Sequence, residues 1–119
     1  MKTVTEHLYD HFYSSYGFYS LPSIEELKES EWSEEYEQLR HNRMVMGAFR
    51  YGQIKYQPLG KFDHSKEAKR RIDLYDQTHN LEHLLDAGNI IMLGFIEAKK
   101  LGHHLFSIDD GTHNPIRKE

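Results

Sequence analysis

The sequence contains no cysteine, and this absence excludes disulfide bonds, thiolate metal sites and a cysteine nucleophile. Long apolar runs are missing too: the longest, residues 90–93, is far shorter than the roughly 20 residues that cross a bilayer. No apolar core of a signal peptide follows Met1. We therefore expect a cytoplasmic protein with no membrane partner.

The chain also lacks a surplus of basic charge. Its 15 Lys and Arg residues stand against 19 Asp and Glu residues, which gives a formal net charge of -4. Affinity for a nucleic-acid backbone depends on a basic surplus, so we expect no general binding of nucleic acid. A small anionic ligand held by a few local arginines is compatible with this charge.

What the sequence does contain predicts a helical protein. A chain of 119 residues fits one domain, over residues 1–119. Capping residues and helical periodicity predict four helices, over residues 24–29, over residues 33–50, from residue 63 or 65 to residue 76, and over residues 81–100. No alternating strand pattern occurs, and residues 103–119 show no helical period. We expect an all-α protein: a compact bundle of four to five helices with an irregular C-terminal tail.

Residues 1–21 are rich in aromatic side chains. Tyr9, Phe12, Tyr13 and Tyr16 have the i, i+3, i+4, i+7 spacing of one helical face, which predicts a further helix. That face would pack on the domain or across a dimer interface. Stacking on nucleic-acid bases is the alternative, although the basic neighbours typical of such a surface are missing. We expect the protein to form a homo-oligomer.

The helix predicted over residues 81–100 is apolar nearly all round, and polar residues lie within it. A helix of that composition belongs at the centre of a bundle. Glu82, Asp86 and Asn89 fall within roughly 60° of one another around its axis. Buried carboxylates are costly unless they meet a cation, a metal ion or several donors. We therefore expect such a partner beside this strip.

Arginines in the neighbouring helices are the predicted partners. Arg43 and Arg50 share an apolar face of the helix over residues 33–50, and Arg71 lies in the apolar stripe of the next helix. The pattern predicts a polar centre between three helices, held by pairs of arginine and carboxylate. In particular, we expect the Arg50 guanidinium to be buried and paired with Glu82 or Asp86.

Two interpretations of this polar centre stay open. It is either a structural salt-bridge network, or a pocket in which arginines bind phosphate and carboxylates hold a divalent cation. Three arginines against two carboxylates favour an anionic ligand, because a structural network should balance its charge.

The stretch from residue 71 to residue 95, with Glu82, Asp86 and Asn89 on one helix after a tight link, resembles the MazG-like all-α nucleoside triphosphate pyrophosphohydrolases. It is also similar to small, mostly uncharacterised helical proteins of phages and prophages. In the enzymes, acidic pairs on two helices bind Mg²⁺ against the phosphates of the nucleotide, and water attacks to release pyrophosphate. The resemblance implies that Asp86 and Asn89 stand in the place of the second pair.

The function expected from the sequence is therefore that of a phage-type nucleotide-binding protein, and as an enzyme a magnesium-dependent nucleotide pyrophosphohydrolase. Two non-catalytic alternatives are an inhibitor of host defence that sequesters a nucleotide signal, and one that blocks a host defence protein. In the enzyme, the metal ligands would be Glu82 and Asp86, the water or the metal would be positioned by Asn89, and the phosphates would be bound by Arg43, Arg50 and Arg71.

Overall fold

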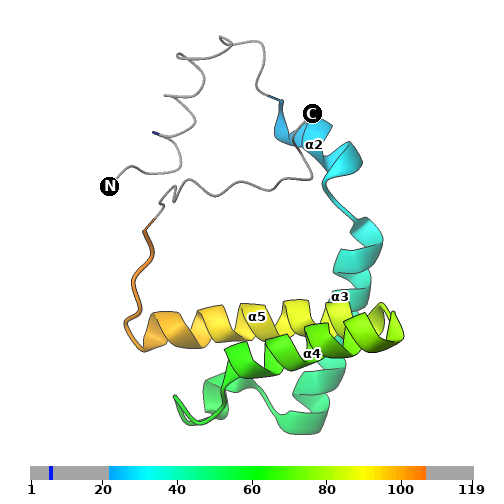
Figure 1. Cartoon of the computed structure of the whole chain (residues 1–119). Coiled ribbons are helices and arrows are strands. Elements are labelled where there is room, and N and C mark those ends of the chain that lie inside the picture. Colours follow the sequence, from blue (N-terminus) through cyan, green and yellow to red (C-terminus); the bar gives the residue numbers. More distant parts are fainter. Residues whose placement is uncertain (1–5, 7–21, 107–119) are drawn as a thin grey trace. The chain divides into compact units, whose positions relative to one another are not determined.

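The computed structural model describes residue 6 and residues 22–106 (Figure 1). This part of the chain contains helices and no strand, so the predicted all-α class is confirmed. The aromatic stripe predicted in residues 7–21 and the tail beyond residue 106 lie outside the described residues. The elements are α2 (Ile24–Ser30), α3 (Glu34–Tyr51), the short 3₁₀-helix η3 (Ile54–Tyr56), α4 (His64–Thr78) and α5 (Glu82–Lys100).

Helices α3, α4 and α5 belong to one compact unit, Trp32–His103, which carries all the site residues predicted from the sequence. Helix α2 belongs to a second unit and has no buried residue of its own. None of the helices in the described residues is both long and apolar enough to cross a membrane.

The helices begin where capping side chains predict. The Ser23 hydroxyl accepts a hydrogen bond from the Glu26 amide (3.2 Å), and the Ser33 hydroxyl accepts one from the Tyr36 amide (3.0 Å). Asp63 does the same for the first turn of α4. Such bonds satisfy amides that have no partner within the helix. The starts of α2, α3 and α4 are therefore fixed by local sequence.

Helices α4 and α5 form an antiparallel hairpin, side by side in Figure 1. The link between them is short because His79 closes α4 in a left-handed conformation (φ 57°). Small residues allow close packing: Ala68 and Ala87 are buried, and a Cβ atom at Gly94 would lie only 2.9 Å from the His64 Cβ. Glycine at position 94 therefore lets the start of α4 approach α5 closely.

Helix α3 crosses the N-terminal half of α5 instead of running along it (Figure 1). The crossing is close at Gly88, where a Cβ atom would meet the Tyr36 hydroxyl at 2.0 Å. Further along α5, Ile91 and Phe95 stay 56% and 54% exposed. Helix α5 is thus covered around only part of its circumference, although its composition predicts a fully enclosed helix.

Candidate functional site

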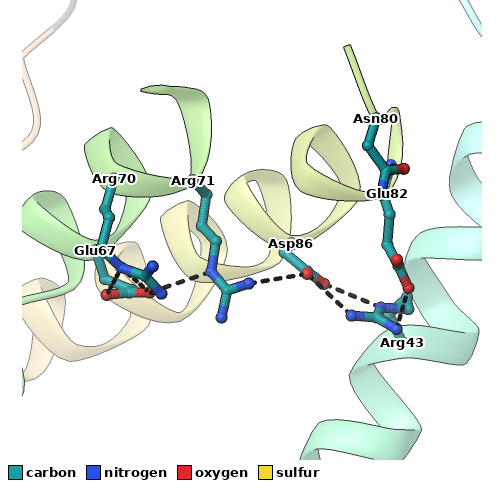
Figure 2. A network of polar contacts seen from close by, with 7 residues as sticks. All are labelled: Arg43, Glu67, Arg70, Arg71, Asn80, Glu82 and Asp86. Carbon is teal, nitrogen blue, oxygen red and sulfur yellow. Dashed lines mark hydrogen bonds and ion pairs between the residues drawn. The ribbon is translucent and has the colours of Figure 1, made fainter. Parts of the chain in front are cut away.

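Asp86 is the centre of a polar network that joins all three helices of the unit. The Arg43 guanidinium, from α3, donates two hydrogen bonds to its carboxylate, from Nε to Oδ1 and from Nη2 to Oδ2, both at 3.0 Å (Figure 2). Arg71, from α4, donates to the same Oδ2 at 3.4 Å. The Asp86 side chain is only 14% exposed. This two-pronged geometry is the strong form of arginine–carboxylate pairing.

The network continues in both directions from Asp86. On one side, Glu82 forms an ion pair with Arg43. On the other, Glu67 accepts hydrogen bonds from Arg71 Nε (3.1 Å) and from Arg70 Nε (3.0 Å). Figure 2 shows the resulting row, in which acidic and basic side chains alternate. The row holds three arginines and three carboxylates, so the surplus of arginine inferred from the sequence does not exist in the folded network.

The pairing keeps these groups charged. The hydrogen bond to Asp86 raises the pKa of Arg43 above its usual value, and the charges of Asp86 and Glu82 add to the effect. The hydrogen bond from Arg70 lowers the pKa of Glu67 below its usual range, and Arg71 contributes in the same direction. Both shifts favour the ionised pair at neutral pH.

Asn89 takes part in a separate contact with α3. The residue is buried, with 6% of its surface exposed. The amide Nδ2 donates to the Arg40 carbonyl oxygen at 2.9 Å, and Oδ1 accepts a hydrogen bond from Arg40 Nη1 at 3.1 Å. Nearby, the Tyr36 hydroxyl donates to the Leu84 carbonyl oxygen at 3.3 Å. Both ends of the Asn89 amide therefore hold α3 on α5.

The structure brings four of the six predicted site residues into one network: Arg43, Arg71, Glu82 and Asp86. The predicted pairing of arginine and carboxylate between three helices is confirmed for them. The prediction for Arg50 is wrong: the residue is exposed and pairs with no residue in the described part of the chain. Arg50 has nearly the helical phase of Arg43 but lies about 10 Å further along the axis, past the point where α3 crosses α5.

The carboxylates as arranged do not fit a resident magnesium ion. Glu82 and Asp86 both pair with Arg43, and a divalent cation there would compete with the guanidinium charge. Among residue 6 and residues 22–106, no group of three or more His, Asp or Glu side chains could hold a metal ion. Magnesium binding stays a prediction from the sequence.

A second polar pair, which sequence reasoning missed, lies near the other end of α5. Glu97 and His64 have side chains that are 10% and 12% exposed, and 3.6 Å separates the His64 Nδ1 from the Glu97 Oε1. Glu97 continues the strip of Glu82 and Asp86, three turns beyond Asp86. This continuation was the available signal for Glu97, whereas nothing in the sequence marks His64.

The pair of His64 and Glu97 faces an open cavity of about 610 Å³. Phe62, Ile91 and Ala98 contribute apolar walls, and Lys61 and His103 also line the cavity. The rings of Phe62 and His64 meet edge to face, with centroids 4.8 Å apart and planes inclined by 73°.

This arrangement offers a ligand flat apolar walls and a neighbouring donor and acceptor. The imidazole can donate or accept a hydrogen bond, and the carboxylate accepts two or more. The site therefore combines polar recognition with apolar contact.

Comparison with known proteins finds no family model, no curated protein and no solved structure that matches this chain. The resemblance to MazG-like enzymes and to small phage proteins stays a prediction from the sequence.

Proposed function

We propose that the protein binds a nucleotide or nucleotide-like small molecule in the cavity beside His64 and Glu97. One observation carries the proposal: a buried carboxylate and a largely buried imidazole lie side by side in the wall of a cavity that also has apolar side chains. The volume, about 610 Å³, lies within the usual range for small-molecule sites, which are mainly apolar with a few convergent polar groups.

Glu97 is the residue that most needs a ligand. A buried carboxylate is costly unless hydrogen-bond donors surround it. In the part of the chain that the structure describes, this carboxylate meets one side chain, His64, at 3.6 Å. Each carboxylate of the Asp86 network, by contrast, contacts at least one guanidinium. An N–H group from a ligand would supply the donors that Glu97 lacks.

A nucleobase matches the chemistry of this cavity. Proteins read an unpaired base through hydrogen bonds to its polar edge and through contacts of its flat faces with aromatic and apolar side chains. Glu97 can accept from ring and amino N–H groups of a base, and His64 can bond the neighbouring atom. Phe62 and Ile91 offer surface to the faces of the ring.

We assign the phosphates of the ligand to Lys61 and His103, which line the same cavity. Lysine is a common partner of phosphate as a point charge. Arg43 and Arg71, which the sequence predicted for this role, already have their charge matched by carboxylates. Hydrolysis through Glu82 and Asp86 is not part of the proposal for the same reason. Sequestration of a nucleotide signal needs only binding.

The test is isothermal titration calorimetry of the purified chain with the common nucleoside triphosphates and monophosphates, first without magnesium. The test variant is Glu97→Gln, and the matched control is Glu82→Gln on the same helix. We expect the first to weaken binding by about tenfold to a hundredfold, because a charge-assisted hydrogen bond is lost. The control should bind as the wild type does.

Two results would contradict the proposal: no nucleotide binds to the wild-type chain, or the Glu82→Gln variant loses binding while Glu97→Gln keeps it. A parallel assay for pyrophosphate release in magnesium buffer distinguishes binding from catalysis. Release that depends on Glu82 would favour the enzyme predicted from the sequence.

A further inference from the structure

One face of α3 lies beside the face that contacts α5, and it is apolar and exposed. Its four residues lie within about 120° around the axis, from Leu39, next to the side that holds Tyr36 and Arg43, round to Val45 on the far side. Phe49 is 91% exposed and Val45 is 59% exposed. Scattered exposed apolar residues are normal, but a row of them on one helical face marks an interaction surface. The row consists of Leu39, Val45, Met46 and Phe49, and we call it the α3 apolar face.

Opposite charges flank the α3 apolar face at its two ends. Glu35, in the first turn of α3, has the helical phase of this face, and Arg50, in the last turn, lies at the edge of the face nearest the phase of Arg43. The two are separated by 15 residues, about 22 Å along the axis. Neither side chain has an ion-pair partner within residues 22–106, and both residues are exposed.

We propose that the α3 apolar face binds a second copy of this chain, with the two α3 helices antiparallel. In the register whose two-fold axis passes between residues 42 and 43, Leu39 of one copy lies against Met46 of the partner subunit. The same register places Glu35 of each copy opposite Arg50 of the partner subunit, and it does so twice. This charge complementarity favours a second copy over an unrelated protein. Antiparallel packing also opposes the two helix dipoles.

The size of the surface sets the strength of the dimer. Helix α3 has 18 residues and is about 27 Å long. Only four exposed apolar side chains form the face. The area that it can bury is therefore at or below the lower end of the range for specific interfaces, which is about 1,200–2,000 Å² in total. The dimer therefore dissociates on dilution.

The interface also accounts for the wrong prediction that Arg50 is buried. Its position beside Leu39 and Met46 predicted a covered guanidinium with a carboxylate partner. In the dimer that partner is Glu35 of the partner subunit, not Glu82 or Asp86 of the same chain.

Sedimentation velocity over a concentration series tests this interface. Phe49→Asp should make the chain monomeric at all concentrations, while circular dichroism stays unchanged because Phe49 is already exposed. The control, Phe95→Asp, places the same charge on an exposed aromatic residue of α5 and should leave the dimer intact. A monomeric wild type, or a dimer that survives Phe49→Asp, would overturn the proposal.

A charge exchange tests the register. Glu35→Arg alone should weaken dimerisation by about tenfold, and Arg50→Glu alone should do the same. The double variant, with both changes, recreates the opposite pairs and should recover most of the lost affinity. A double variant weaker than either single variant would show that the two α3 helices do not pack in this antiparallel register.

Discussion

Two regions of α5 hold buried acidic side chains, and they differ in how fully those side chains are satisfied. Around Asp86, three carboxylates and three arginines alternate, and each carboxylate contacts at least one guanidinium. Around Glu97, one carboxylate meets one imidazole at 3.6 Å, beside a cavity of about 610 Å³. The first region is complete without a ligand, whereas the second has both spare hydrogen-bonding capacity and space.

In the region around Asp86 the buried charges stabilise the packing of helices, and in the region around Glu97 we propose that they bind a ligand. A satisfied network fixes which helices meet and in what register, because its carboxylates are already paired with guanidinium groups. A partly satisfied pair that borders a cavity gains hydrogen bonds when a ligand enters. We therefore expect substitutions around Asp86 to change stability and substitutions around Glu97 to change binding.

The largest expected effect on stability comes from Asp86→Ala. The change leaves Arg43 and Arg71 without their shared carboxylate in a partly buried position, so we expect a loss of about 3 kcal/mol in the free energy of unfolding. The control is Glu82→Ala, which removes a carboxylate that is 46% exposed and should cost less than about 1 kcal/mol. Urea unfolding measures both. Equal losses would contradict a network centred on Asp86.

Asn89→Ala should have the next largest effect. The variant removes the donor to the Arg40 carbonyl oxygen and the acceptor for Arg40 Nη1, at a cost of about 2 kcal/mol. Urea unfolding gives the cost, and calorimetry should show unchanged affinity for nucleotide. A normal stability combined with lost nucleotide binding would instead support the ligand-handling role predicted from the sequence.

The pH dependence of the free energy of unfolding tests the ion pairing of Glu67 within the network. Because Arg70 and Arg71 lower the pKa of Glu67 below its usual value of 4.5, its pairing stabilises the fold above about pH 4.5. That contribution is lost as the pH falls through the lower folded pKa. Glu67→Gln should lower the free energy of unfolding at pH 7 by about 1 kcal/mol and flatten its acid dependence.

Urea unfolding of the wild type and of Glu67→Gln, measured between pH 7 and pH 3, tests this prediction. The exposed cap Asp63 has a lowered pKa of the same sign and is present in both proteins, so it does not affect the difference. A difference between the two free energies of unfolding that grows as the pH falls would contradict the lowered pKa of Glu67.

The smallest effect is expected at His83, which belongs to neither region. Its Nδ1 is buried and has no hydrogen-bond partner in the described residues. Replacing a buried, unpaired polar group with an apolar side chain is neutral or stabilising. We expect His83→Leu to raise the free energy of unfolding by up to about 1 kcal/mol, measured by urea unfolding. A clear loss of stability would show that His83 has a polar partner.

Local signals in the sequence predicted much of the fold. The caps at Ser23 and Ser33 act within a few residues, so they predict the starts of α2 and α3 directly. The apolar residues of α5 predict that helix in the same local way. Helical phase also placed Arg43 and Arg71 toward Asp86. It could not place Arg50, because phase says nothing about the point at which α3 crosses α5.

The parts that the sequence did not predict depend on contacts between helices. Glu67 and Arg70 read as an ordinary exposed pair on one helix, and only the packing of α4 on α5 joins them to Asp86. The His64 and Glu97 side chains are 33 positions apart. They meet because Gly94 lets the start of α4 approach α5, a register that no local pattern encodes.

The most direct test of the central claim is a nuclear magnetic resonance titration of the wild-type chain with the nucleotide that binds best in calorimetry. Backbone amide shifts report where the ligand sits. We expect the largest changes on residues 60–65, Gly94 and Glu97, and only small changes near Arg43 and Asp86. Changes concentrated around Arg43, Glu82 and Asp86, with residues 60–65 unaffected, would contradict this expectation.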